Sequence, residues 1–120
     1  MELIEIMQQN NFVVVGNTLD NEKYAAKIKQ GLLDSSYNVR GVHKELSSIN
    51  DVDFDIDIID LCINPILGLK YIKECTKSFK TVVIQPGAES DELTSYLKEN
   101  NIDYIEGCLL VGLKLYSKNK

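Results

Sequence analysis

Four short segments carry most of the residues that could bind a ligand: Gly16-Asn17-Thr18-Leu19-Asp20, Val42-His43-Lys44, Ile63-Asn64-Pro65 and Gln85-Pro86-Gly87. Glycine at position 16 lets the chain turn sharply and removes a Cβ that would hold a phosphate at a distance. The start of a following helix offers unpaired N–H groups and a partial positive charge. Residues 16–24 are therefore predicted to bind a phosphate, and the alternative is that Gly16 only permits the turn.

The second segment bears on the kind of nucleotide. NAD sites usually place an acidic residue at the end of the second strand, where it holds the ribose hydroxyls. In this chain His43 and Lys44 stand at that position. A basic pair can hold a phosphate on the ribose, which favours an adenosine with an extra phosphate over NAD. The alternative is that Lys44 is an ordinary exposed loop lysine.

The nucleophilic and metal-binding residue types form no catalytic or metal-binding pattern. His43 is the only histidine, and no serine or second acidic residue is placed where it would indicate a catalytic group with His43. The three cysteines, Cys62, Cys75 and Cys108, show no CxxC spacing. No catalytic residue and no metal site are predicted. Acidic residues precede Cys108, so a buried structural cysteine is favoured over a thiol that exchanges with a ligand. Asp60 lies inside an apolar strand and is expected to accept backbone or hydroxyl hydrogen bonds.

Predicted strands and helices alternate along the chain and position these segments. Apolar runs predict strands at 12–15, 38–42, 56–63, 81–84 and 102–105. Apolar spacing and capping residues predict helices at 2–9, at 22–34, from 65 and from 91. This alternation implies parallel strands with right-handed crossovers. The predicted fold is α/β, a three-layer Rossmann-like fold with a five-stranded parallel sheet in the order 3-2-1-4-5. Ligands of such sheets bind at the carboxyl ends of the strands, where the order reverses.

Length and composition indicate a single domain over residues 1–120. The chain has 18 acidic and 13 basic residues, a net charge of -5, which argues against a nucleic-acid-binding protein. No apolar run approaches the roughly 18 residues that span a bilayer, so no membrane contact is predicted. The acidic start resembles no export signal, and the odd number of cysteines is typical of reduced thiols. We therefore expect a cytoplasmic location.

The segment 108–116 is more apolar than is usual near a chain end. Leu113 and Leu115 alternate with Lys114, which predicts an extended conformation. An apolar surface of this kind is usually covered. We expect the segment either to dock on the first helix of the body or to form a homodimer contact.

Five segments resemble, in their order and spacing, the sequences of a known family. They are Val13-Val14-Val15-Gly16, Tyr37-Asn38-Val39 followed by Val42-His43-Lys44, Ile56-Asp57-Ile58-Ile59-Asp60-Leu61, Val83-Ile84-Gln85-Pro86-Gly87-Ala88 and Gly107-Cys108. The family is that of the small stand-alone CoA-binding proteins with a Rossmann-like fold, which are related to the CoA-binding domain of succinyl-CoA synthetase. The first loop departs from the family's Ser, Pro and Arg, and only Thr18 and Lys23 could replace the hydroxyl and the cation. Asp20 and Glu22 in the same loop would oppose an anion unless they point away.

The resemblance implies a nucleotide-binding module for CoA or an acyl-CoA, without catalytic machinery. The residues expected to contact the ligand follow the order of its parts: Gly16, Asn17, Thr18, Lys23 and Tyr24 at the diphosphate; Val42, His43 and Lys44 at the adenosine and ribose phosphate; Ile63, Asn64, Pro65, Gln85 and Gly87 along the floor. One alternative is an NAD(H)-binding or redox-responsive protein that uses the same crevice. Another is an interaction subunit whose pocket is empty.

Overall fold

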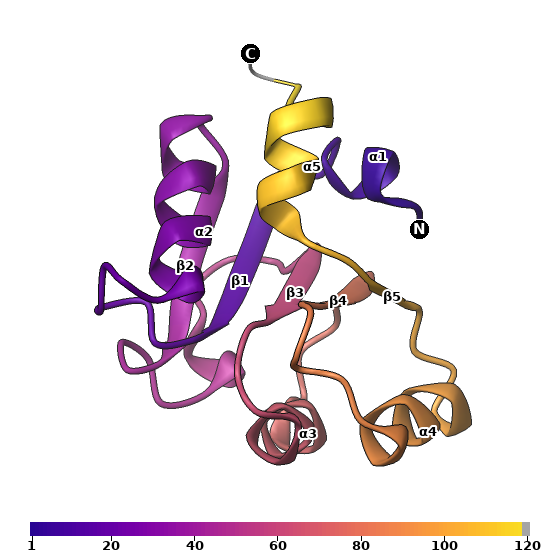
Figure 1. Ribbon diagram of the computed structural model, residues 1–120. Helices are drawn as coiled ribbons and strands as arrows, with labels where there is room; N and C mark the ends of the chain where they lie inside the picture. Colours follow the sequence, from indigo (N-terminus) through magenta and orange to yellow (C-terminus); the bar gives the residue numbers. More distant parts are fainter. Residues whose placement is uncertain (119–120) are drawn as a thin grey trace.

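Five parallel strands form the centre of the computed structural model, which describes residues 1–118 (Figure 1). The strands are β1 (Asn11–Gly16), β2 (Asn38–His43), β3 (Ile58–Leu61), β4 (Thr81–Ile84) and β5 (Tyr104–Glu106). The helices are α1 (Leu3–Ile6), α2 (Tyr24–Asp34), α3 (Pro65–Glu74), α4 (Asp91–Glu99) and α5 (Leu109–Tyr116), with a short 3-10 helix, η1 (Ile49–Asp51). No helix within residues 1–118 combines the length and the apolar character that a membrane span requires.

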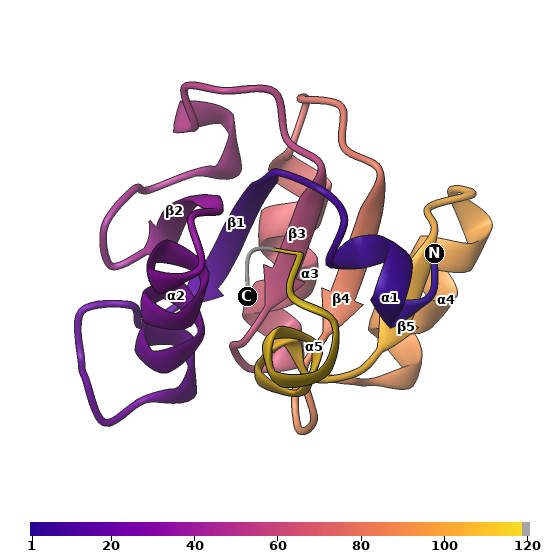
Figure 2. The ribbon, with the colours of Figure 1, turned by 90° about the horizontal axis from the view of Figure 1, so that it is seen from above.

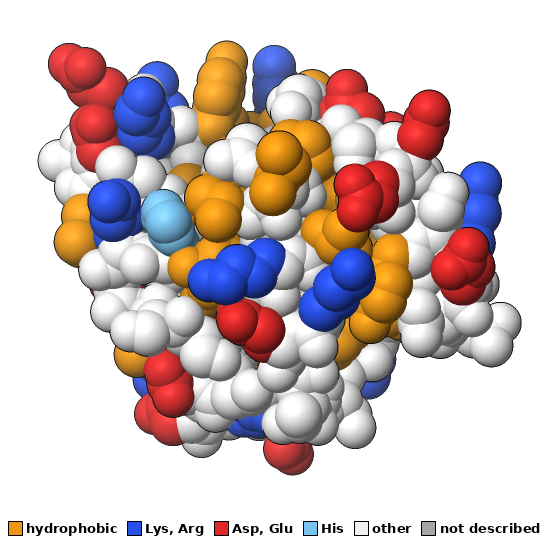
Figure 3. Space-filling model, turned by 90° about the horizontal axis from the view of Figure 1, so that it is seen from below, with side chains coloured by type: hydrophobic (Ala, Val, Ile, Leu, Met, Phe, Trp, Pro, Cys, Tyr) orange, Lys and Arg blue, Asp and Glu red, His pale blue; other side chains and the backbone are white. Residues whose placement is uncertain are grey.

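The helices cover both faces of the sheet. Figures 1 and 2 show α1, α2 and α5 on one face and α3 and α4 on the other. Apolar side chains fill both layers because successive residues of β1 point to opposite faces: Phe12 and Val14 belong to the core under α2, and Val13 and Val15 to the core under α3. The predicted three-layer α/β fold is confirmed. On the outer face of α3 and α4, basic and acidic side chains are mixed with hydrophobic ones (Figure 3).

The strand order in the structure is 2-1-3-4-5, which differs from the expected 3-2-1-4-5 in the place of β3. β3 pairs with β1 and is buried on both faces, whereas β2 is exposed at Asn38 and Arg40 and forms the edge. A strand that is apolar on both sides belongs at the centre of a covered sheet. Asp57 holds β3 in place, because its carboxylate accepts the N–H groups of Asn10 and Asn11 at 3.1 and 2.9 Å.

Two elements near the ends of the chain differ from prediction. The N-terminal helix covers only Leu3–Ile6, and the segment predicted to be extended is instead the helix α5. In the helix, Leu109 and Leu113 lie one turn apart and point inward, while Gly112 lies against Met7. The alternation of leucine and lysine was therefore misleading, since the same residues also fit helical spacing. The expected docking on the body is confirmed, because α5 packs against α1 and α2.

Candidate functional site

A crevice lies where β1 and β3 end, at the point where the strand order reverses. The chain leaves β1 towards α2 on one face and leaves β3 towards α3 on the other, so the two connections diverge. A hollow of about 350 Å³ opens between them, lined by Asn17, Lys23, Tyr24, Ala25, His43, Lys44, Cys62 and Ile63. It thus brings together six of the thirteen predicted binding residues: Asn17, Lys23, Tyr24, His43, Lys44 and Ile63.

The remaining predicted residues occupy other positions. Gln85 and Gly87 line a neighbouring hollow of about 230 Å³ above β4. Val42 is buried in the core, and Asn64 caps α3 by accepting the N–H of Leu67 at 3.0 Å, with Pro65 at the first position of the helix. Thr18 is buried and Gly16 is enclosed by its neighbours. Asn64 and Pro65 therefore have a structural role as a helix start, as their residue types also predict.

Gly16 is needed because the turn after β1 passes very close to β3. A Cβ at this position would stand 2.4 Å from the carbonyl oxygen of Cys62 and 2.9 Å from Cβ of Ala25. Both distances are shorter than any normal contact, and the first is to backbone, which cannot move aside. Glycine here lets β1, β3 and α2 approach one another, so it brings the start of α2 to the mouth of the crevice.

The start of α2 brings backbone N–H groups without a side-chain cap to the crevice. Lys23 is the N-cap residue, and within the described chain no side chain accepts a hydrogen bond from the first turn. The first N–H groups of a helix have no partner inside the helix and carry a partial positive charge. Tyr24 and Ala25, at the start of this turn, line the crevice together with the lysines at 23 and 44. The site is thus suited to an anion.

The acidic residues of the first loop do not face the crevice. Asp20 and Glu22 are exposed and are absent from its lining. The loop is folded on itself: Asn17 Oδ1 accepts the N–H groups of Leu19 and Asp20 at 3.3 and 3.2 Å, and Asp20 Oδ1 accepts the N–H of Glu22 at 3.0 Å. The carboxylate of Asp20 is therefore bound to the backbone of its own loop. Asp20 and Glu22 thus leave the crevice free of acidic side chains from this loop, as the binding of an anion there requires.

A side-chain network ties the first loop to the end of β2. The hydroxyl of Thr18 donates to Glu45 Oε2, and Lys29 Nζ donates to both carboxylate oxygens of Glu45 at 2.7 Å. Burial by itself raises the pKa of Glu45, but the hydrogen bonds from Lys29 and Thr18 and the charge of Lys29 outweigh it, so the pKa lies below its usual value. The hydroxyl of Thr18 thus holds the first loop to Glu45, and nothing in the spacing of 18, 29 and 45 indicated this network.

Glu45→Gln is expected to lower the free energy of unfolding by about 1 kcal/mol at pH 7, because a charged acceptor of two hydrogen-bonded partners becomes neutral. A carboxylate with a lowered pKa contributes stability that is present above pH 4.5 and lost as the pH falls through the folded pKa. The difference from wild type should therefore become smaller as the pH falls below 4.5. Urea unfolding at pH 7 and pH 3.5 measures it, and Asp53→Asn, which removes the exposed partner of Arg40, should change little. An equal loss at both pH values would contradict the role of the charge.

His43 has an unusual backbone at the rim of the crevice. Its φ is +113°, a region that residues with a side chain rarely adopt. Its N–H donates to the carbonyl of Leu46 at 2.8 Å, and its ring Nδ1 lies 2.9 Å from the hydroxyl of Tyr71. These contacts hold the ring beside α3, and Lys44 is exposed at the rim of the same hollow. Strained backbone of this kind is concentrated at functional sites.

Asp60 contradicts the expectation that it accepts hydrogen bonds. Its side chain is fully buried in the layer under α5, and neither carboxylate oxygen has a hydrogen-bond partner within the described chain. Burial, and to a lesser extent the Cys108 thiol, raise the pKa of Asp60 well above its usual value. The raised pKa means that the fold favours the protonated, neutral form of this carboxyl.

Comparison with known proteins agrees with this geometry. A sequence profile described as "CoA binding domain" matches residues 10–114, which include all five strands and the whole lining of the crevice. The chain belongs to this CoA-binding domain family. The resemblance that the sequence motifs indicated is thereby confirmed.

Solved structures share the fold of this CoA-binding family member. A conserved hypothetical protein from Pyrococcus furiosus is 29% identical, with a TM-score of 0.77 over 86% of this chain and 98% of the other. A hypothetical protein from Pyrococcus horikoshii OT3 is 20% identical, with a TM-score of 0.83 over 95% and 89% of the two chains. A protein from Thermus thermophilus is 22% identical, with a TM-score of 0.77 over 95% and 98%. No curated protein matches the chain.

Proposed function

We propose that this protein binds CoA or an acyl-CoA in the crevice at the ends of β1 and β3, and that it has no catalytic residues of its own. The observation that carries the proposal is the uncapped start of α2, which faces the same hollow as Lys23 and Lys44. Backbone N–H groups, a helix dipole and two cations suit the diphosphate of a nucleotide. Membership of the CoA-binding domain family supports CoA as that nucleotide.

Lys44 is the residue proposed to contact the phosphate on the ribose. It lies at the end of β2, is exposed at the rim, and has no acidic neighbour to neutralise it among the residues that line the crevice. Its neighbour Glu45 is already paired with Lys29. The lysine is therefore available to an anionic ligand. An acid at this position, which NAD sites use for the ribose hydroxyls, is missing, and the family match gives no support to NAD(H).

Lys44→Ala is expected to weaken CoA binding about tenfold and to leave the affinity for dephospho-CoA unchanged, because only CoA carries the ribose phosphate. Titration calorimetry of both ligands against both proteins measures this, with NAD and NADP as competitors. The control is Lys98→Ala, which removes an exposed lysine in the last turn of α4, at the opposite edge of the sheet. Equal losses for CoA and dephospho-CoA would contradict the role given to Lys44, and tighter binding of NAD would favour the redox alternative.

The exposed side of α1 and α5 supports a second candidate, an interaction subunit or homodimer. Ile4, Val111 and Leu115 are large apolar side chains that remain exposed on these adjacent helices. Analytical ultracentrifugation over a range of concentrations tests this candidate. A concentration-dependent mass without heat on addition of any nucleotide would favour it over ligand binding.

A further inference from the structure

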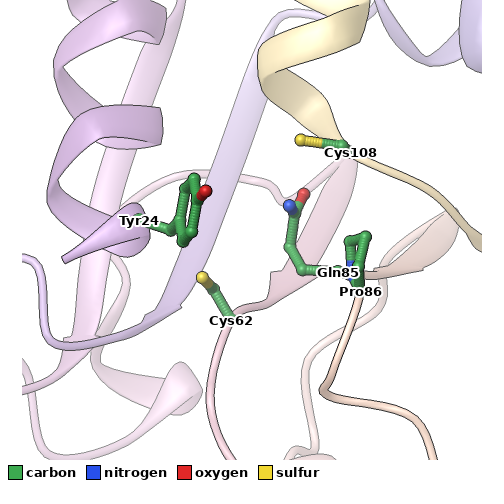
Figure 4. Close-up of a pocket in the computed structure, with 5 residues that line it drawn as sticks. All are labelled: Tyr24, Cys62, Gln85, Pro86 and Cys108. Carbon is green, nitrogen blue, oxygen red and sulfur yellow. The ribbon is translucent and has the colours of Figure 1, made fainter.

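A further, smaller cavity opens beside the crevice, on the α5 side of the sheet. Its volume is about 190 Å³, and it lies between α2, α5 and the ends of β3 and β4 (Figure 4). The lining is formed by Tyr24, Cys62, Gln85, Pro86 and Cys108. Tyr24 and Cys62 also line the crevice, so the two spaces share a wall. A ligand whose phosphates lie at the start of α2 can therefore extend into the cavity.

We infer that this cavity receives the acyl group of a short, uncharged acyl thioester, an inference that rests on the proposed function. Its size sets the upper limit of the group. An engineered cavity of about 150 Å³ holds the six carbons of benzene, so about 190 Å³ accommodates about seven non-hydrogen atoms. These are the sulfur and the carbonyl oxygen of the thioester and an acyl chain of about four carbons. Tyr24, Pro86 and the two cysteines make the lining largely apolar.

The surroundings of the cavity are electrically neutral. Burial, with smaller contributions from Asp60 and Cys108, raises the pKa of the Cys62 thiol to about 12. The carboxyl of Asp60 is buried within electrostatic range of both cysteines. None of the five lining residues is a cation. An acyl group with its own carboxylate would lose its hydration in this cavity without gaining a partner, which is strongly unfavourable.

Gln85 supplies one polar contact to the cavity. The residue is 4% exposed, and its Oε1 accepts the N–H of Leu109 at 2.9 Å, which fixes the amide against the start of α5. Its Nε2 has no hydrogen-bond acceptor among residues 1–118, and Figure 4 shows the amide nitrogen on the side turned towards Tyr24, across the cavity. This donor can bind the carbonyl oxygen of a thioester. The amide is fixed at its oxygen by the start of α5, and its nitrogen is left as a hydrogen-bond donor at the cavity.

Titration of the full-length protein with CoA, butyryl-CoA, octanoyl-CoA and succinyl-CoA tests the inference. Butyryl-CoA should bind about tenfold more tightly than CoA, since each buried methylene favours binding. Octanoyl-CoA, which is too long, should gain nothing over butyryl-CoA, and succinyl-CoA should bind no more tightly than CoA. Cys108→Met places a larger side chain in the cavity and should reduce the ratio of the butyryl-CoA and CoA affinities to about one. Cys75→Met, on the opposite layer, should keep the ratio.

The outcomes separate the cavity from the crevice. If CoA binds and butyryl-CoA binds no more tightly to the wild type, the acyl cavity is wrong and the proposed function stands. Tighter binding of succinyl-CoA than of butyryl-CoA likewise overturns the neutral cavity alone. If neither CoA nor any thioester binds, both the inference and the proposed function are overturned. The wild-type ligand series decides these cases even if Cys108→Met does not fold.

Discussion

Gly16→Ala is expected to destabilise the protein by about 3 kcal/mol and to weaken CoA binding at least tenfold. The added Cβ would stand 2.4 Å from the carbonyl oxygen of Cys62, so β1 and β3 must separate at their ends or α2 must move outward. Overpacking against backbone in a well-packed region costs about this much. Either movement displaces the first turn of α2 from the crevice, and so the loss of stability and the loss of binding have one cause. Urea unfolding and calorimetry measure them.

Gly107→Ala is the matched control for this substitution. Gly107 also follows a strand at the same edge of the sheet, but the nearest atom to a Cβ built there is Cδ1 of Ile105 at 3.6 Å, an ordinary contact. The N–H of Gly107, which donates to the carbonyl of Ile84, is kept by alanine. This variant should lose less than 0.5 kcal/mol. Similar losses in both variants would show that glycine itself, and not the approach of β1 to β3, matters at these positions.

Asp60→Leu is expected to raise the free energy of unfolding by about 1–3 kcal/mol at pH 7, because it replaces an unpartnered buried polar group by an apolar one of similar shape. Thermal and urea unfolding measure the gain. Asp60→Asn separates polarity from charge: it cannot ionise but keeps polar atoms in the same place. It should therefore gain less than the leucine variant. A loss of stability in the leucine variant would show that Asp60 has a favourable partner.

The pH dependence of the free energy of unfolding provides a second test of the raised pKa of Asp60. Its folded pKa is raised, so its contribution to stability is fully present below the unfolded pKa near 4 and is lost as the pH rises towards the folded pKa. The loss is at most about 1.4 kcal/mol per pH unit. The gain of Asp60→Leu over the wild type should therefore grow between pH 4 and pH 8. A constant gain would mean that the carboxyl is ionised in the folded state.

The residue pattern was sufficient to predict the fold class and most of the crevice. The apolar run of β1 and the Asn-Pro start of α3 are local signals, because a strand covered on both faces and a helix start impose residue types directly. Gly16, His43 and Lys44 followed from the rule that ligands bind where parallel strands end. A family resemblance read from five short segments was confirmed over residues 10–114.

What the sequence could not decide depends on pairs of residues far apart in the chain. β3 lies beside β1 with Asp57 bound to the backbone of Asn10 and Asn11, which are 47 and 46 residues away in the chain. The bond of Thr18 to Glu45, and the lack of a hydrogen-bond partner for Asp60 among residues 1–118, are likewise products of packing. The type of a residue limits the interactions that its side chain can make, but the tertiary structure decides whether a partner lies close enough to make them. For this protein, local pattern determined the elements and the edge of the sheet where the crevice lies, and the packing of distant segments determined the strand order, the loop network and the cavity beside α5.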